Sequence, residues 1–139
     1  MLWGGDTAPT FSDDGSPYPI PTYFPPLGGF RFVVFTISPD STVVPEGVDV
    51  EAETKKILEI FPDAYTYMEP DHPGMHTTDT IDFEYVLSGE VWLELDDGVQ
   101  VHLKPGDTVV QNGTRHAWRN KGNEVCRMLG ILLGAHRQR

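Results

Sequence analysis

The second half of the chain consists almost entirely of short segments that favour β-strands. From Tyr65 onward, stretches of apolar, β-branched and aromatic residues alternate with turn residues such as Gly, Pro, Asp and Asn. Such a succession is typical of a β-sandwich or a β-barrel. An earlier strand, "FRFVVFTIS", runs from Phe30 to Ser38 and is ended by Pro39. The later strands are expected at residues 65–69, 82–87, 90–95, 99–104, 108–111, 115–119 and 125–133.

The sequence "VWLELDDGVQVHL" predicts a hairpin whose register can be argued from its side chains. A two-residue loop would mix apolar and polar residues on each face. A three-residue loop, Asp96-Asp97-Gly98, pairs Leu93 with Val101 and places every aliphatic residue on one face. We therefore expect the three-residue loop, with Gly98 in the left-handed conformation. The opposite face then carries Trp92, Glu94, Gln100 and His102.

The first part of the chain has a different composition. Residues 1–29 are rich in Pro, Gly, Ser and Asp, and proline at this density disfavours helices and central strands. This N-terminal arm is either disordered or held against a hydrophobic surface by its aromatic residues. These aromatic residues are Phe11, Tyr18, Tyr23 and Phe24.

One short helix is predicted at about residues 49–61, within "DVEAETKKILEIFPDA". Asp49 can cap its first turn, and Pro62 ends it. Ile57, Ile60 and Phe61 form a short apolar stripe at helical spacing. We expect this helix to cover the core, with a role as a lid as the alternative.

Length, charge and cysteine content exclude several classes of protein. A chain of 139 residues fits one domain with a hydrophobic core of its own. The net charge of −11 argues against a surface for nucleic acids or anionic membranes. The single cysteine, Cys126, is expected to be a buried structural thiol. With no signal-peptide pattern and no long apolar run, the sequence predicts a soluble, cytoplasmic protein.

Ionisable residues lie where the strand "YVLSG" begins, although burying such groups is costly unless they are paired or bind a metal. His76 precedes this strand, and Asp82 and Glu84 enter it. Because the two carboxylates are two residues apart, they point to the same face of the strand. A second histidine, His116, begins a later strand and is followed at period two by Trp118. Two such strands can be neighbours in an antiparallel barrel.

The spacing of these residues resembles the two motifs of the cupin superfamily over about residues 74–133. The first motif reads roughly G-x5-H-x-H-x3,4-E-x6-G. In this chain His76 matches the first histidine, Thr78 replaces the second, Asp82 replaces the glutamate, and Gly89 follows after six residues.

The second cupin motif reads roughly G-x5-P-x-G-x2-H-x3-N. Gly113, His116 and Asn120 match it, whereas Gln111 occupies the proline position. The resemblance implies an all-β, single-domain cupin barrel (a jelly roll or double-stranded β-helix) over residues 30–139, with one short helix and the proline-rich arm.

The resemblance also implies a divalent metal site. Its ligands would be His76, Asp82 and His116, with Thr78 or water at the vacated position. Two imidazoles and a carboxylate suit Fe(II) and would also take Mn, Ni or Zn. The alternative is a barrel whose polar groups pair only with one another. Either Asp82 or Glu84 could be the carboxylate ligand, and the motif spacing favours Asp82.

These assignments predict an enzyme acting on a small oxygenated organic molecule. Glu84, Asp82 and His116 would be catalytic, Glu84 as the proton-transfer group, and Thr78 and Trp118 would line the substrate pocket. We expect metal-assisted, redox-neutral chemistry by a dehydratase, another lyase or an isomerase. A non-haem Fe(II) dioxygenase is the first alternative, and a non-catalytic module that binds a small ligand is the second. The resemblance also implies a homodimer, in which the arm or the N-terminal strand crosses onto the other subunit.

Overall fold

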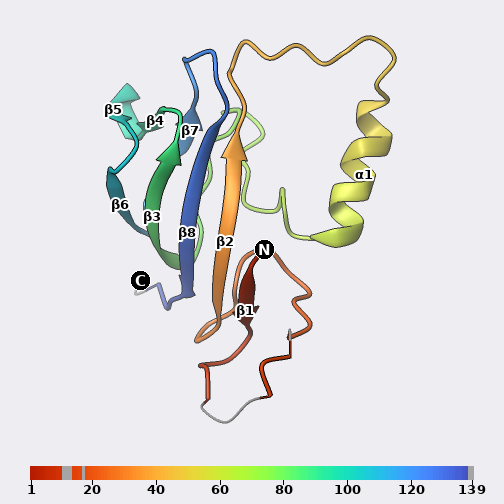
Figure 1. Cartoon of the computed structure of the whole chain (residues 1–139), viewed down its shortest axis with the longest axis vertical. Coiled ribbons are helices and arrows are strands. Elements are labelled where there is room, and N and C mark those ends of the chain that lie inside the picture. Colours follow the sequence, from red (N-terminus) through yellow and green to blue (C-terminus); the bar gives the residue numbers. More distant parts are fainter. Residues whose placement is uncertain (11–13, 17, 138–139) are drawn as a thin grey trace.

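The computed structural model describes residues 1–10, 14–16 and 18–137, so Phe11 of the predicted arm lies outside the described residues. The strands form two antiparallel sheets (Figure 1). The five-stranded sheet has the order β1-β2-β8-β3-β6 and the three-stranded sheet the order β5-β4-β7. In chain order the elements are β1 (Trp3–Gly5), β2 (Phe30–Ile37), α1 (Val50–Ile60), β3 (Thr80–Ser88), β4 (Val91–Glu94), a 3-10 turn η1 (Asp96–Gly98), β5 (Gln100–Leu103), β6 (Thr108–Asn112), β7 (Ala117–Arg119) and β8 (Cys126–Gly134). The expected all-β architecture with one short helix is confirmed.

Side chains alternate between the two faces of the central strands. On β3, Thr80, Asp82, Glu84 and Val86 are buried and point toward the barrel interior, whereas Phe83, Tyr85 and Leu87 are exposed. The aliphatic core lies toward one end of the barrel and includes Cys126, the expected buried thiol. Its buried members are Val86, Val91, Leu93, Leu103, Cys126 and Met128.

The predicted three-residue hairpin is confirmed. Leu93 pairs with Val101, and the Leu95 amide donates to the Val99 carbonyl at 2.8 Å. The left-handed conformation occurs at Gly98 (φ 71°) and also at Asp97 (φ 59°). Because the alternation of aliphatic residues fixes the register, the local sequence was sufficient to predict it.

Another turn depends on a glycine of the first motif. Gly89 joins β3 to β4 with φ 72°, and a Cβ there would lie 2.8 Å from Cα of Cys126. A residue with a side chain would be strained at this positive φ, and its Cβ would clash with the backbone of β8.

The helix is confirmed within one residue at each end. Asp49 accepts a hydrogen bond from the Ala52 amide at 3.0 Å, as an N-cap does. The helix buries none of its residues fully, and it lies beside the five-stranded sheet rather than in the core (Figure 1). Ile57 reaches a cavity of the barrel instead.

The predicted strand at 65–69 is wrong. This segment forms consecutive turns. In them the Thr66 amide donates a hydrogen bond to the backbone carbonyl of Asp63, and the Met68 amide donates one to the backbone carbonyl of Tyr65. Only an isolated bridge between Met68 and His76 has strand-like pairing there. Alternating aromatic residues imitate a strand pattern, but the local turn hydrogen bonds prevail.

The N-terminal arm packs against its own chain. Trp3–Gly5 form the edge strand β1 beside β2, and Gly4 fits there because a Cβ would lie 2.8 Å from the Phe30 carbonyl oxygen. The arm therefore joins the sheet before its prolines begin. In the described part of the chain, no helix is long and apolar enough to cross a membrane.

Candidate active site

A cavity of about 280 Å³ lies where the barrel meets the arm and the helix. Two histidines and two carboxyl groups line it, and they are the residues identified from the sequence: His76, Asp82, Glu84 and His116. Trp118 lines it too, as expected. The other lining residues are aromatic or apolar, apart from one phenol, and comprise Tyr23, Phe24, Phe35, Ile57, Phe61, Ala64, Met68 and Leu132. The cavity therefore has a small polar part within apolar walls, the usual character of a small-molecule site.

The two histidines are brought together by a backbone bridge. The His76 amide donates to the His116 carbonyl at 2.9 Å, and the reverse bond is 3.0 Å. Their ring centroids are 4.3 Å apart. His76 Nδ1 lies 3.0 Å from the Gly74 carbonyl oxygen, and His116 Nδ1 lies 2.8 Å from that of Thr114. Since a carbonyl only accepts, both Nδ1 atoms carry the proton and both Nε2 atoms keep a free lone pair.

Burial keeps both imidazoles neutral. It lowers the pKa of His76, and together with the charge of neighbouring His76 it lowers the pKa of His116 to about 4. Hydrogen bonds to the backbone carbonyls oppose this effect only partly. At neutral pH each ring is therefore a hydrogen-bond acceptor or a base through Nε2.

The carboxyl groups are also buried, with Asp82 5% and Glu84 8% exposed. Burial raises the pKa of Asp82 to about 6, against a smaller opposing effect of the Thr80 hydroxyl. Burial and the nearby Asp82 charge raise the pKa of Glu84 to about 8. At neutral pH Asp82 is thus mostly ionised, whereas Glu84 keeps its proton. Two like groups with different protonation states are the usual arrangement for a paired acid and base.

Three buried polar atoms in the described structure have no hydrogen-bond partner. They are Asp82 Oδ1, Glu84 Oε2 and Gln111 Nε2. Gln111 is the register partner of Asp82 across β3 and β6, so the three atoms belong to neighbouring positions of one sheet face. Because unpaired polar groups are costly to bury, atoms of this kind mark a place where a ligand can pair with them.

The metal ligands expected from the resemblance come together only in part. His76 and His116 form a pair with the tautomer that a metal requires. However, within residues 1–10, 14–16 and 18–137, no three His, Cys, Asp or Glu side chains form a group that could hold a metal ion. Asp82 lines the same cavity but does not complete such a group with the imidazoles. The arrangement therefore does not fit a three-ligand metal site as it stands.

Two residues of the cavity wall were not predicted from the sequence as part of a site. Tyr23 and Phe24 come from the arm, where their backbone amides donate to the Asp63 carboxylate at 2.7 and 3.0 Å. Tyr23 packs edge-on against Phe61, at 5.4 Å between ring centroids. Burial and the charges of the two carboxyl groups raise the pKa of Tyr23 to about 12, so the phenol stays protonated. The many aromatic residues of the proline-rich arm were the sequence feature that could have indicated its contact with the cavity.

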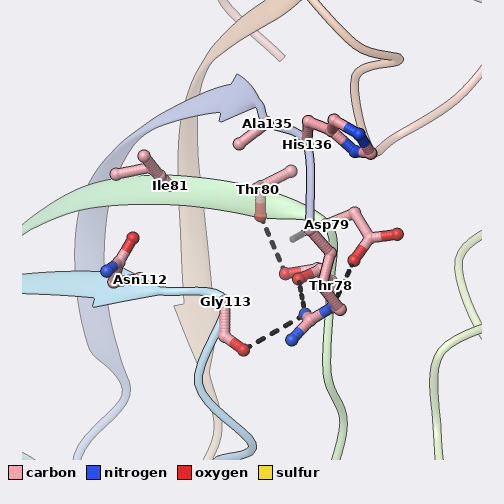
Figure 2. A pocket seen from close by; sticks show the side chains of 9 residues that line it. Thr78, Asp79, Thr80, Ile81, Asn112, Gly113, Ala135 and His136 are labelled. Carbon is pink, nitrogen blue, oxygen red and sulfur yellow. Dashed lines mark hydrogen bonds and ion pairs between the residues drawn. The ribbon is translucent and has the colours of Figure 1, made fainter. Parts of the chain in front are cut away.

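Thr78 does not line this cavity. Its hydroxyl is hydrogen-bonded to that of Thr80 at 2.7 Å, and it lines a second cavity of about 260 Å³ near the end of β8 (Figure 2). There the Arg137 guanidinium donates to the carbonyls of Thr78 and Gly113 and pairs with Asp79 at 2.7 Å. The Thr78 hydroxyl and the Arg137 guanidinium of this second cavity are thus already bonded to other groups of the cavity. The assignment of Thr78 to the substrate pocket stays a prediction, and this geometry does not support it.

His102 and Arg115 make contacts with other side chains outside the cavity. His102 stacks on Trp92 with ring centroids 4.1 Å apart and pairs with Glu90, in keeping with its expected place on the outer face of the hairpin. Arg115 pairs with Glu69 at 2.6 Å and points away from the site. The ionisable side chains that line the described cavity are therefore His76, Asp82, Glu84, His116 and Tyr23.

Comparisons with known proteins agree with this picture of the barrel. The family described as "Cupin domain" matches residues 65–132. A phomopsin biosynthesis cluster protein C' of Diaporthe leptostromiformis is 47% identical over 62 residues, which are 44% of this chain and 33% of that protein. A cupin-domain-containing oxidoreductase of Neurospora crassa is 39% identical over 61 residues, 43% of this chain and 31% of that protein. The matched segment thus spans only about a third of these relatives.

Among solved structures, an uncharacterised protein with a double-stranded β-helix domain from Klebsiella pneumoniae is similar to this chain. It has a TM-score of 0.49 and 18% sequence identity, over 78% of this chain and 66% of that one.

Proposed function

The chain carries a cupin domain and belongs to the cupin superfamily. We propose that it is an enzyme that transfers protons in a redox-neutral reaction of a small organic molecule. A dehydration, with isomerisation as a related outcome, fits the residues of the cavity best. The observation that carries the proposal is the pair of buried carboxyl groups with unlike protonation states in an otherwise apolar cavity.

In this mechanism Glu84 is the general acid and Asp82 the general base. Ionised Asp82 removes a proton from a carbon next to the carbonyl of the substrate. Glu84 protonates the hydroxyl group that departs, which leaves as water while the carbon–carbon double bond forms. Each turnover ends when the proton held by Asp82 returns to Glu84 through solvent.

The other polar residues orient the substrate. The free Nε2 atoms of His76 and His116 accept hydrogen bonds from substrate hydroxyl groups, since both rings are neutral. The protonated phenol of Tyr23 is available as a donor to a carbonyl oxygen. Trp118 stands with its ring edge-on to His116, at 5.7 Å between centroids, and restrains the imidazole.

The walls of the cavity support a substrate class. A volume of about 280 Å³ with mostly aromatic and aliphatic lining favours a compact, apolar molecule with one or two oxygen functions. Because Asp82 already places a negative charge inside, a neutral substrate is favoured over an anionic one. A relative named for a fungal biosynthesis cluster supports an intermediate of secondary metabolism as the substrate.

A divalent metal stays a prediction that the mechanism does not use. Cupin domains typically bind such an ion, and the imidazole pair offers two nitrogen ligands here. Elemental analysis of protein purified without chelator or nickel resin, together with His76→Ala and His116→Ala, tests it. Stoichiometric metal that both substitutions remove would establish the site, and protein free of metal would reject it.

An oxidoreductase is the second candidate, because a relative with 39% identity over the matched segment bears that name. It differs from the first candidate in what it consumes. An oxidoreductase of the dioxygenase type would take up O₂, whereas dehydration leaves the oxidation level of the substrate unchanged.

The decisive experiment incubates the protein with a panel of apolar β-hydroxy carbonyl compounds in D₂O, under argon and under air. We expect loss of water and deuterium exchange at the α-carbon without O₂, with kcat/KM falling below about pH 6 and above about pH 8 as the two carboxyl groups titrate.

The matched variants are Glu84→Gln and Asp82→Asn, which should each lower kcat/KM by a factor of about 100 to 10,000. Glu46→Gln, at an exposed position, is the control that should leave it unchanged. Turnover that requires O₂ would favour the oxidoreductase. Ligand binding without turnover would leave the non-catalytic binding module.

A further inference from the structure

A short chain of hydroxyl groups connects the two cavities described above. Thr78 and Thr80 are each 3% exposed, and their hydroxyl oxygens lie 2.7 Å apart (Figure 2). The Thr80 hydroxyl in turn forms a hydrogen bond with the Asp82 carboxyl. Because Asp82 Oδ1 has no partner within the described residues, the bond to Thr80 is made by the other carboxyl oxygen. Asp82 is therefore linked to Thr78 by consecutive hydrogen bonds.

The alternation of side chains along β3 produces this arrangement. Thr80 and Asp82 are two residues apart and both are buried, so they project from the same face of the strand. Asp82 lines the first cavity, of about 280 Å³, whereas Thr80 lines the second, of about 260 Å³. Adjacent positions of one sheet face thus belong to different cavities, and Thr80 is the residue that joins them.

The segment that carries Thr78, just before β3, is held by the end of β8 and the residues after it. The Arg137 guanidinium donates to the Thr78 carbonyl at 2.9 Å and to the Gly113 carbonyl at 3.2 Å. The Ala135 amide donates to the Asp79 carbonyl at 2.9 Å. These contacts fix the backbone, so the pair of hydroxyl groups has a defined position.

The second cavity opens to solvent. Its exposed lining residues are Asp79, Asn112, His136 and Arg137. Water that enters between them can reach the buried Thr78 hydroxyl. In the first cavity, by contrast, a bound substrate would exclude water from Asp82. The hydroxyl chain is then the remaining connection between this carboxyl and the solvent.

A hydroxyl group both donates and accepts a hydrogen bond, so a chain of hydroxyls can pass a proton from one end to the other. We propose that Thr80 and Thr78 form a relay that carries the proton held by Asp82 to water in the second cavity. This inference rests on the function proposed above, in which Asp82 removes a proton from the substrate. It gives Thr78 a role that differs from the predicted one at the wall of the substrate pocket.

The transfer conserves protons at each step. After Asp82 has taken the substrate proton on Oδ1, its carboxyl turns about the Cβ–Cγ bond and presents this proton to the Thr80 oxygen. Thr80 passes its own hydroxyl proton to Thr78, which passes its own to water. One proton leaves Asp82 and one hydronium ion forms, and rotation of both hydroxyls restores the starting state. Glu84 regains from solvent the proton that it gave to the departing hydroxyl.

Exchange of the hydroxyl protons with solvent tests the path without a substrate. In an equal mixture of H₂O and D₂O, the Cβ of a threonine gives two ¹³C signals if its hydroxyl exchanges slowly and one if it exchanges rapidly. We expect one signal for Thr80 in the wild type, although its side chain is buried. Thr78→Val removes the link to the second cavity and should split this signal into two, whereas Thr78→Ser keeps a hydroxyl and should leave it single. Two signals in the wild type, or one in Thr78→Val, would overturn the proposal.

Turnover separates the relay from the acid–base pair. Thr78→Val keeps the bond between Thr80 and Asp82, so KM and the first turnover should not change. Later turnovers wait for the proton to leave, so kcat should fall about tenfold, less than the factor of about 100 or more for loss of a general acid or base. Thr78→Ser should restore kcat, and Thr36→Val, at an exposed position of β2, is the matched control that should equal the wild type.

The two measurements distinguish failure of the relay from failure of the proposed function. Circular dichroism verifies that each variant is folded. If Thr78→Val turns over at the wild-type rate, the relay is wrong although the acid–base mechanism stands. If the wild type converts no compound of the panel, the proposed function fails, and the exchange of the Thr80 hydroxyl still decides whether the path to the second cavity exists.

Discussion

At the scale of single residues, the alternation of side chains along β3 decides which carboxyl groups enter the barrel. The spacing of Asp82 and Glu84 predicts that both point to one face, and the structure places both in the barrel interior. The same spacing predicts that one carboxyl has a raised pKa, because two carboxylates in a poorly hydrated site repel each other. In the structure burial contributes more than the repulsion does.

Glu84→Gln should stabilise the protein at neutral and alkaline pH. The folded-state pKa of about 8 lies above the ordinary value of 4.5, so the folded state binds more protons between these two values. The free energy of unfolding of the wild type therefore falls, relative to the variant, as pH rises from about 4.5 to about 8. Above pH 8 the difference should be constant at several kcal/mol, since each pKa unit corresponds to about 1.4 kcal/mol.

Urea denaturation between pH 5 and pH 9 measures this difference. Glu46→Gln, which changes an exposed carboxylate, is the control and should follow the wild type at every pH. Parallel curves for wild type and Glu84→Gln would contradict the burial of an easily protonated carboxyl.

At the scale of elements, the arm is fixed on both sides of Tyr23. Before Tyr23, the Arg31 guanidinium donates to the carbonyls of Gly5 and Thr22 and to the Thr22 hydroxyl. After it, Asp63 accepts from the backbone of Tyr23 and Phe24. A fully buried arginine on β2 and a turn after the helix thus hold one wall of the cavity.

Removing this attachment should open the cavity wall. Arg31→Ala should lower the free energy of unfolding by on the order of 3 kcal/mol, because it leaves the carbonyls of Gly5 and Thr22 without this donor. Thr22→Val is the milder variant, and it should increase hydrogen exchange at residues 18–24 without unfolding the barrel. Exchange in that segment equal to wild type would contradict the attachment. Glu59→Ala, on the exposed side of the helix, is the control.

Local sequence was sufficient for some elements and not for others. The hairpin and the capped helix were predictable because their register and ends depend on neighbouring residues. The position of Tyr23 was not, since it depends on Arg31 and on Asp63, which lies forty residues away in sequence. For the same reason, turns around Asp63 replaced the strand expected at 65–69.

At the scale of the whole molecule, the sheet separates two kinds of surface. Its inner face holds the ionisable residues of the cavity, and its outer face is apolar. The ionisable residues of the inner face could be picked out from the sequence, because the motif spacing around His76 and His116 resembles that of cupins. It did not predict the outer face, because strand segments such as "DFEYVL" carry large apolar residues at positions of both parities, and only the observed sheet order decides which are covered.

The net charge of −11 gives a prediction at the same scale. Added salt screens repulsion between surface charges, so the melting temperature should rise between low and physiological ionic strength. Differential scanning fluorimetry in NaCl measures this rise, with an uncharged osmolyte at matched osmolality as the control. A melting temperature independent of salt would show that the acidic surface is not under appreciable repulsion.

The central claim is that Glu84 is protonated at neutral pH inside the cavity. Titration of the glutamate side-chain carboxyl carbons by ¹³C NMR, in the wild type and in Glu84→Gln, measures this without a substrate. The account predicts one glutamate resonance that titrates near pH 8 and is missing from the variant. If every glutamate of the wild type titrates below about pH 5, near the ordinary value, Glu84 is not the acid and the proposed mechanism is wrong.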